Sequence, residues 1–285
     1  MTDLRAAPAA PLAIAAGQAA CAPLDVAANA ATAAGLVRRA AGQGADLLVL
    51  PELFLTGYEM TAITADPARH AVTGADARLD ALASACADTR TAVAVGAPVH
   101  DPDAGVTHIG VLVLGRDGRF AARYAKQHVD SDERAAGFTA GPRGCTLVLD
   151  GWRLGLGICW DASFPEHARA AALDGCHAYL VSALFPRGRG ERKRAVLGPA
   201  RALDNAMYVA AANHNGPSGP LHGCGGSAVW GPDGGLLADA GDSDPGLAVA
   251  RLEPEALAEA RSGDLPMADP SFSAPARPRN EMDVH

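Results

Sequence analysis

The 285-residue sequence lacks the features that mark several large classes of protein. It has no apolar run near the roughly 20 residues that a membrane-spanning helix needs, so we expect no membrane partner. Its formal net charge of −8 is the opposite of the basic excess with which general nucleic-acid binders displace counterions, so we expect no nucleic-acid partner either. With 49% hydrophobic and 20% charged residues, the composition is typical of an ordinary globular protein.

The sequence also lacks a disulfide framework. Its six cysteines are scattered and include no CxxC pair, which is typical of free thiols in a reducing compartment. The Ala- and Pro-rich start of the chain carries Asp3 and has no Leu-rich central stretch, which argues against a signal peptide. We therefore expect a cytoplasmic protein whose cysteines are all free: Cys21, Cys86, Cys145, Cys159, Cys176 and Cys224.

Lysine is nearly absent. Of the 24 basic residues, 22 are arginine, and Lys126 and Lys193 are the two lysines. Arginine stays protonated and planar, whereas a lysine ammonium is compact and its pKa can be tuned by the surroundings. A lysine kept in a chain so rich in arginine is therefore a candidate for a position where arginine cannot substitute.

Apolar strand-like runs alternate with helical stretches along most of the chain, which predicts an α/β fold. Turn residues between neighbouring apolar runs predict three β-hairpins, so the sheets should be mixed. About a dozen strands with four or five helices predict two sheets stacked between helix layers. The predicted hairpins span residues 107–126, 146–159 and 227–238, and the predicted helices span 25–41, 75–89, 165–173 and 192–205.

The end of the chain differs in composition from the rest. From Ser262 onward it is Pro-rich and shows no periodicity. Such tails are usually disordered unless they dock on a partner. We predict one domain over residues 1–261, followed by a tail over 262–285 that docks on a partner subunit or has no fixed structure.

Cys159 stands at the end of a predicted buried strand, Leu154-Gly-Leu-Gly-Ile158, and just before a helix that has Pro165 in its first turn. A cysteine placed there would be exposed at the carboxyl edge of a sheet, where a helix N-terminus and a nearby cation would lower the pKa of its thiol. The alternative is a buried structural cysteine, which is the commoner role of a single cysteine.

Two charged residues also follow predicted strands. Glu52 follows Val49-Leu50-Pro51, and burial there would raise the pKa of its carboxyl group and make it a general base near neutral pH. Lys126 ends a strand and could stabilise an oxyanion. The alternatives are a solvated loop carboxylate and a surface lysine.

Together these segments resemble the nitrilase, or carbon–nitrogen hydrolase, superfamily. The resemblance is carried by Leu-Val-Leu-Pro-Glu52-Leu-Phe-Leu-Thr-Gly-Tyr58, by Tyr-Ala-Lys126-Gln-His and by Gly-Ile-Cys159-Trp-Asp-Ala-Ser-Phe-Pro-Glu166. Supporting stretches extend it over roughly residues 12 to 252.

The resemblance implies a four-layer α-β-β-α sandwich whose subunits pair across a helical face into a homodimer or larger homo-oligomer. It places the Glu–Lys–Cys triad of the family on Glu52, Lys126 and Cys159, and an acidic residue that positions the lysine on Glu133. It implies an oxyanion contact from the Trp160 backbone N–H. It implies no metal and no organic cofactor.

The implied activity is hydrolysis of a non-peptide C–N bond in a small-molecule substrate, through a thioester on the cysteine. Trp160-Asp161 and the modest chain length resemble the amidase branch, with a small aliphatic amide or ω-amide as substrate. The alternatives are an N-carbamoyl amine or amino-acid hydrolase and a catalytically idle homologue that acts as a binding protein. The candidate pocket walls are aromatic: Phe54, Tyr58, Trp160, Phe164 and Phe185.

The sequence departs from the family pattern in two places. Asp204 replaces a glutamate that members usually carry. Arg192-Lys193-Arg194 replaces a His-Trp pair before the same helix, at a place that bears on the substrate.

A basic run and a group of histidine and cysteine residues suggest other sites, but neither pattern is specific. The basic run over residues 187–194 is expected to be a solvated loop and helix start or an anion clamp, not a nucleic-acid site. His214, His222 and Cys224 fit no common zinc spacing.

Overall fold

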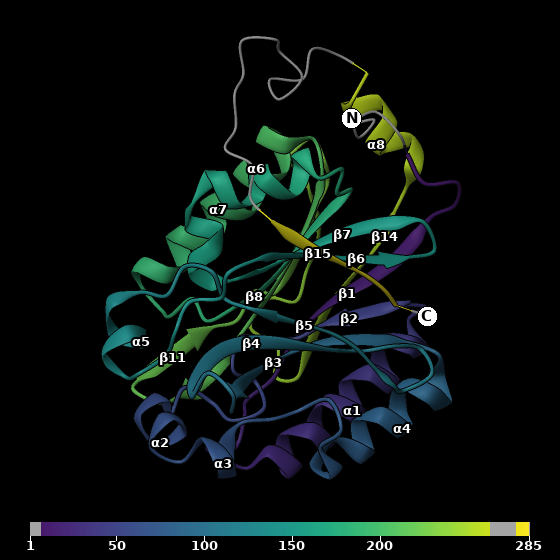
Figure 1. Ribbon diagram of the computed structural model, residues 1–285. Helices are drawn as coiled ribbons and strands as arrows, with labels where there is room; N and C mark the ends of the chain where they lie inside the picture. Colours follow the sequence, from purple (N-terminus) through teal and green to yellow (C-terminus); the bar gives the residue numbers. More distant parts are fainter. Residues whose placement is uncertain (1–6, 263–277, 285) are drawn as a thin grey trace.

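Two β-sheets packed face to face form the centre of the protein (Figure 1). The computed structural model describes residues 7–262 and 278–284. Apolar side chains from both sheets, among them Ile14, Leu47, Leu156 and Leu180, form one core between the sheets. Helices cover both outer faces, so the predicted four-layer sandwich with mixed sheets is confirmed.

The first sheet mixes parallel and antiparallel strands. In spatial order its strands are β14 (Gly246–Leu252), β1 (Leu12–Gln18), β2 (Leu47–Val49), β3 (Ala92–Asp101), β4 (Val106–Leu114) and β5 (Phe120–Ala125). β1, β2 and β3 pair in parallel, whereas β14, β4 and β5 pair antiparallel with their neighbours.

Helices α1 (Val26–Gly42) and α4 (Asp80–Thr89) cover the outer face of this sheet, at the bottom of Figure 1. Small and aliphatic side chains such as Ala33, Val37 and Leu82 pack against it. The side chain of Asp25 accepts a hydrogen bond from the backbone N–H of Ala28 at 3.0 Å and caps α1, as the sequence predicts.

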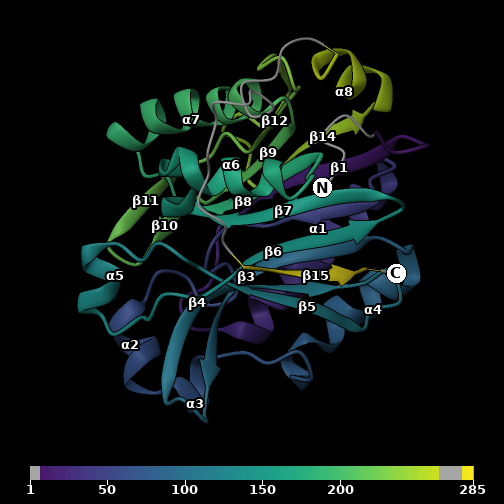
Figure 2. The same ribbon diagram turned by 45° about the horizontal axis from the view of Figure 1, so that its top comes forward.

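The second sheet lies above the first, and α6 (Pro165–Leu173) and α7 (Arg189–Asn205) cover its outer face (Figure 2). β7, β8 and β9 are parallel and carry the centre of the sheet. In spatial order its strands are β13 (Leu236–Asp239), β12 (Ala228–Trp230), β9 (Tyr208–Asn213), β8 (Ala178–Ala183), β7 (Trp152–Ile158), β6 (Gly144–Leu149) and β15 (Arg279–Asp283).

The three predicted hairpins and the four predicted helices are present. α6 has the predicted bounds, α7 begins three residues earlier than predicted, and α4 begins at Asp80 after a 3-10 turn, Ala77–Leu79. No helix within the described residues is long and apolar enough to cross a membrane. The elements that the sequence did not predict are too short for a periodic pattern: α2 (Met60–Ala65), α3 (Pro67–His70), α5 (Ser131–Ala135), α8 (Pro254–Ala260), the strand β15 and the hairpin of β10 (Asn215–Ser218) and β11 (Leu221–Cys224).

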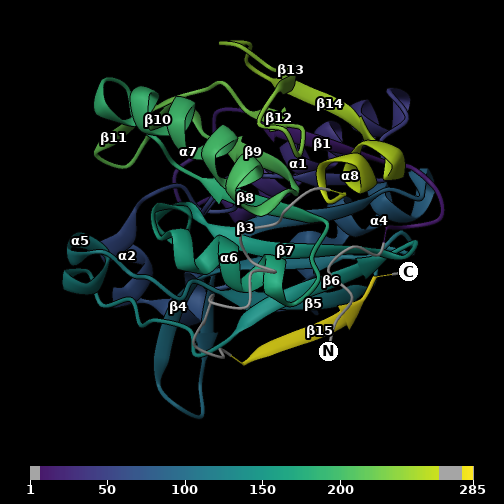
Figure 3. The ribbon, with the colours of Figure 1, turned by 90° about the horizontal axis from the view of Figure 1, so that it is seen from above.

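The end of the chain returns to the edge of the second sheet. β15 pairs in parallel with β6 of the same chain, from Arg279 opposite Gly144 to Asp283 opposite Val148 (Figure 3). Residues 263–277, which hold most of the predicted tail, lie outside the described residues. Docking of the tail on a partner subunit stays a prediction.

Candidate active site

The strand directions bring the three predicted catalytic residues to one end of the sandwich. β5 runs in the same direction as β2, because two antiparallel pairings separate it from β3. Glu52 lies three residues beyond β2 and Lys126 directly follows β5, so both leave the same edge of the first sheet. Cys159 directly follows β7 of the second sheet. Tyr124 and His128, which flank Lys126, donate hydrogen bonds to Asp161, two residues after Cys159, so the two edges face each other.

A fully buried ammonium group lies at the centre of the site. Lys126 Nζ is 2.6 Å from Oε1 of Glu52 and also contacts Oε1 of Glu133. All three side chains are at most 1% exposed. Because a buried charge is costly unless it is paired, the lysine must be buried together with its two carboxylates.

Local structure fixes Glu133 in place. It lies in the first turn of α5, where its Oε2 accepts the backbone N–H of Asp130 at 3.0 Å while Asp130 caps the helix in return. The hydroxyl of Tyr58 donates to Oε1 of Glu133 at 2.9 Å. These bonds aim the carboxylate at Lys126, which agrees with the positioning role that the resemblance implies for Glu133.

The backbone around Glu52 is held by close packing. A side chain at Gly96 would place its Cβ 2.0 Å from the carbonyl oxygen of Pro51, so only glycine lets β3 approach so closely. The Nε2–H of His214 donates to the carbonyl oxygen of Glu52 at 2.5 Å. Burial lowers the pKa of His214 to about 4, so this histidine is neutral.

One carboxylate oxygen of Glu52 accepts no hydrogen bond from the described residues. Oε1 binds Lys126, and buried Oε2 has no hydrogen-bond partner among the described residues. Burial raises the pKa of Glu52 from 4.5 to about 7, since it outweighs the attraction of Lys126. The free oxygen of a carboxylate with such a pKa is suited to take up and return a proton near neutral pH.

Cys159 has an unusual backbone and a neutral thiol. Its φ of 38° lies in the left-handed region, a conformation that costs about 1–3 kcal/mol and persists where the surroundings enforce it. Burial and the negative charge of Glu52 raise the pKa of the thiol well above its ordinary value, and Lys126 only partly offsets them. The predicted lowering of this pKa is therefore wrong, because burial outweighs the effect of the nearby cation.

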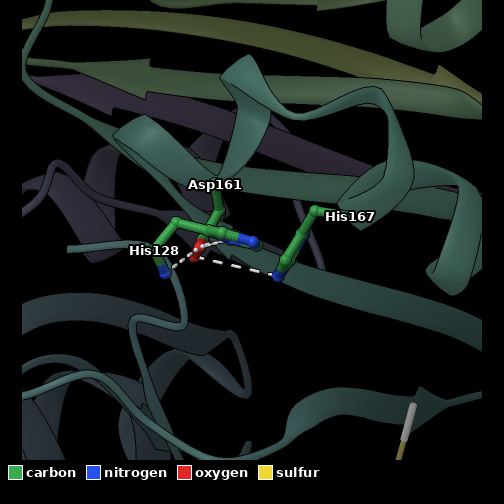
Figure 4. Close-up of side chains that lie close together, drawn as sticks. All are labelled: His128, Asp161 and His167. Carbon is green, nitrogen blue, oxygen red and sulfur yellow. Dashed lines mark hydrogen bonds and ion pairs between the residues drawn. The ribbon is translucent and has the colours of Figure 1, made fainter. Parts of the chain in front are cut away.

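A buried carboxylate next to the nucleophile joins the two sheets (Figure 4). Oδ1 of Asp161 accepts the backbone N–H and the Nδ1–H of His128, both at 2.9 Å. Its Oδ2 accepts the hydroxyl of Tyr124 at 2.6 Å and the backbone N–H of Ile158 at 3.0 Å. Ile158 precedes the cysteine, and Tyr124 and His128 flank the lysine, so one carboxylate holds both catalytic segments.

The hydrogen bonds continue beyond Asp161 into the helix layer. The Nε2–H of His167 donates to the hydroxyl oxygen of Tyr124 at 2.9 Å, and its Nδ1 is hydrogen-bonded to the hydroxyl of Tyr179 at 2.8 Å. Burial would raise the pKa of Asp161, but His167 and the hydrogen bonds from His128 and Tyr124 outweigh it, so this pKa is lowered.

His128, Asp161 and His167 place possible metal ligands within 4.8 Å of one another. Their hydrogen bonds already use both oxygens of Asp161 and both ring nitrogens of His167, so the group is satisfied without an ion. We interpret it as a structural network, and the predicted absence of a metal stays a prediction. His214, the predicted poor zinc ligand, donates a hydrogen bond from its ring to the carbonyl oxygen of Glu52.

Two of the predicted pocket aromatics lie at the surface beside the nucleophile. Trp160 is 37% exposed, and its ring packs edge-on against Phe164, with 6.1 Å between centroids. Phe164 in turn stacks on His128 at 4.1 Å. These three side chains line a surface hollow together with Asp130 and Arg134.

The other predicted aromatics are buried. Phe54 packs in the layer between the first sheet and its helices, and Phe185 packs in the layer between the second sheet and α7. Tyr58 is 6% exposed and supports Glu133. These positions favour structural roles, and their contact with a substrate stays a prediction.

Sequence reasoning did not find the positioning groups Asp161 and His214. In the sequence, Asp161 stands out only for its place after the nucleophile, and His214 fits no common zinc spacing. The one available signal was that both are polar residues at the carboxyl ends of buried strands. Their partners come from elements far away in the sequence, so spacing alone could not identify them.

The comparisons with known proteins agree with this geometry. The sequence profile of the carbon–nitrogen hydrolase family matches residues 13–262. The chain therefore belongs to the carbon–nitrogen hydrolase family, and it is an enzyme that hydrolyses carbon–nitrogen bonds other than peptide bonds.

Similar proteins include curated relatives and solved structures. The "Hydrolase in pqqF 5′ region" of Pseudomonas protegens is 36% identical over 244 residues, covering 84% of this chain and 82% of the relative. Omega-amidase NIT2 of Pongo abelii is 30% identical over 242 residues, covering 82% and 86%. A crystal structure of an amidase from Nesterenkonia sp. superposes with a TM-score of 0.76 at 34% identity, covering 88% and 94%.

We predict that Asp161→Asn destabilises the protein. An asparagine keeps one oxygen but turns an NH2 group toward hydrogen-bond donors, so the variant should lose about 1.5–3 kcal/mol of unfolding free energy in urea denaturation. Asp204→Asn is the control, since Asp204 is 53% exposed and its ion pair with Arg201 is 3.9 Å long. Equal stability of Asp161→Asn and the native protein would contradict the proposed joining of the two segments.

Proposed function

We propose that the protein hydrolyses small amides, with Cys159 as nucleophile and Glu52 as general base. Lys126 and the backbone N–H of Trp160 stabilise the oxyanion, and Glu133 positions Lys126. The observation that carries the proposal is the buried ammonium that contacts both carboxylates and leaves one oxygen of Glu52 free beside a neutral thiol.

The names of similar proteins support an amide as substrate. They include omega-amidases and the amidase from Nesterenkonia sp. AN1, of which one variant was solved in complex with butyramide at 33% identity to this chain. In another structure of that amidase, acrylamide is attached to the active-site cysteine by Michael addition.

The first half of the reaction forms a thioester. Oε2 of Glu52 takes the thiol proton while Cys159 Sγ attacks the amide carbon. The carbonyl oxygen becomes an oxyanion, held by Lys126 and by the N–H of Trp160, which lies in the first turn of a 3-10 helix and has no partner within it. The tetrahedral intermediate collapses, Glu52 gives its proton to the nitrogen, and ammonia leaves.

The second half releases the acid. A water molecule gives a proton to Glu52 as it attacks the thioester carbon, and the same donors hold the second oxyanion. Collapse breaks the C–S bond, and Glu52 returns the proton to the sulfur of Cys159. The sum is amide plus water to carboxylic acid plus ammonia.

We predict that Cys159→Ala lowers amide hydrolysis at least about a thousandfold, because no other group can form the thioester. Mass spectrometry of the native protein during turnover should find an acyl adduct on Cys159, and hydroxylamine should intercept it. Cys224→Ala, which removes a half-buried thiol on β11, is the control and should keep activity.

An adduct on another residue, or turnover by Cys159→Ala, would rule out this scheme. The products separate the alternative substrate class. Release of CO2 together with ammonia would identify an N-carbamoyl compound. Absence of turnover and of adduct across both classes would favour the idle homologue.

We predict that kcat/KM depends on pH through Glu52. The ionised carboxylate is the active form, and its pKa is about 7, so activity should rise with pH and level off above that value. Well below pH 7, kcat/KM should fall about tenfold for each unit by which the pH is lowered. His214, with a pKa of about 4, stays neutral and adds no second transition in this range. An acid limb near 4.5, the ordinary value for glutamate, would contradict the role of burial.

We further propose that the protein is cytoplasmic and forms a homodimer through α7. All six cysteines are free thiols, as a reducing compartment favours. Val196 and Leu203 lie two turns apart on one face of α7 and are 57% and 62% exposed. A Cβ atom at Gly234, in the turn before β13, would lie 3.4 Å from the Cβ of Leu203, so this turn is next to Leu203, and Leu236 of β13 is 58% exposed. Such exposed apolar side chains are typical of an interface between subunits.

We predict that Val196→Glu combined with Leu203→Glu converts the dimer into a monomer, because two buried charges in each subunit would face an apolar surface. Light scattering after gel filtration measures the mass. Met282→Glu, on β15 at the other end of the sheet, is the control and should leave the mass unchanged. A native protein that runs as a monomer would refute the interface.

A further inference from the structure

Lys193, the second of the two lysines, lies beside the reaction site. Its Nζ is 3.8 Å from the ring centroid of Trp160, which directly follows the nucleophile. Burial lowers the pKa of Lys193, and the nearby positive charge of Lys126 lowers it further. α7 thus places a half-buried cation at the rim of the site, where the sequence departs from its family pattern.

This cation has no acidic partner among the described residues. The ion pairs that involve a lysine there both belong to Lys126. Asp130 is the carboxylate whose charge reaches Lys193, but its Oδ1 accepts the backbone N–H groups of Asp132 and Glu133 as the cap of α5. The aromatic face of Trp160 replaces only part of the water that the ammonium loses.

The neighbouring cation on α7 is already engaged. Arg194 donates to the carbonyl oxygen of Gly226 at 2.6 Å and lies 3.7 Å from Asp239. Lys193 is thus the basic side chain of this helix turn that is close to Trp160 and still able to bind an anion. A ligand that contacts the Lys193 ammonium would pair with it best if the ligand itself carried a negative charge.

We propose that Lys193 binds an anionic group, such as a carboxylate, at the end of the substrate remote from the scissile amide. The enzyme then prefers small amides that carry a negative charge over neutral amides of the same length. This inference rests on the proposed function, since it assigns the substrate class of the same site. Trp160 orients the ammonium, and Lys193 is a specificity-determining residue that takes no part in bond making.

The test compares matched substrates in the full-length enzyme. Succinamate is paired with butyramide and glutaramate with pentanamide, and kcat/KM is measured for each. The native enzyme should favour the anion of each pair. In Lys193→Met the ratio of kcat/KM for the anion to that for the neutral amide should fall about 10- to 100-fold, the usual effect of losing a charged hydrogen bond.

A charge reversal distinguishes recognition from simple support of Trp160. Lys193→Glu should invert the preference, so that 4-aminobutyramide, which carries an ammonium group, is hydrolysed faster than succinamate. If Lys193 only supported Trp160, the substitution would lower kcat/KM for all substrates together and could not produce this inversion. Arg192→Met removes an exposed cation from the next position of α7 and should leave the ratio as in the native enzyme.

The outcomes separate the two proposals. Turnover of neutral amides without a preference for anions, or an unchanged ratio in Lys193→Met, overturns the role of Lys193 alone. An equal ratio change in Arg192→Met assigns the effect to general surface charge and also overturns it. Failure of the native enzyme on every amide, with no adduct on Cys159, overturns the proposed function as well.

Discussion

The pairing of the Lys126 ammonium with two carboxylates is the constraint on which the site depends. The charge is completely buried, and removing one partner of such a group typically costs about 3–5 kcal/mol. Several otherwise unrelated features serve this pairing. The capping box of α5 and the hydroxyl of Tyr58 aim Glu133, while Gly96 and His214 hold the backbone of Glu52. The fold thus surrounds one cation with groups that cannot move independently.

The same pairing explains why the protein needs a general base. Burial raises the pKa of the Cys159 thiol, and because two carboxylates already share one ammonium, the charge of Glu52 raises it further. Burial also raises the pKa of Glu52 to about 7, and the charge of Glu133 acts in the same direction. Proton transfer from the thiol to the carboxylate therefore keeps the total charge of the buried cluster constant. The site holds its nucleophile neutral until a substrate accepts the electrons.

The sequence predicted what depends on position along a single strand, and it did not predict what depends on contacts between strands. Glu52, Lys126 and Cys159 follow buried strands, and that pattern together with the family motifs located them. The hydrogen bonds of Asp161 join a 3-10 turn to β5 and to the loop that follows it, and no spacing encodes them. The pKa of Cys159 was predicted in the wrong direction because burial, which only the fold shows, outweighs the nearby cation. The short helix α5 has too few residues for a period, although its cap holds Glu133.

Asp161 has a mechanical consequence for the sandwich. Stacked sheets touch through apolar side chains, whose contacts have no direction and resist sliding only weakly. The nucleophile belongs to one sheet and the lysine to the other, so sliding would change the distance over which they act. Four hydrogen bonds to one carboxylate couple the two edges at that point. The nucleophile and the lysine are therefore held in register with each other by hydrogen bonds as well as by apolar packing.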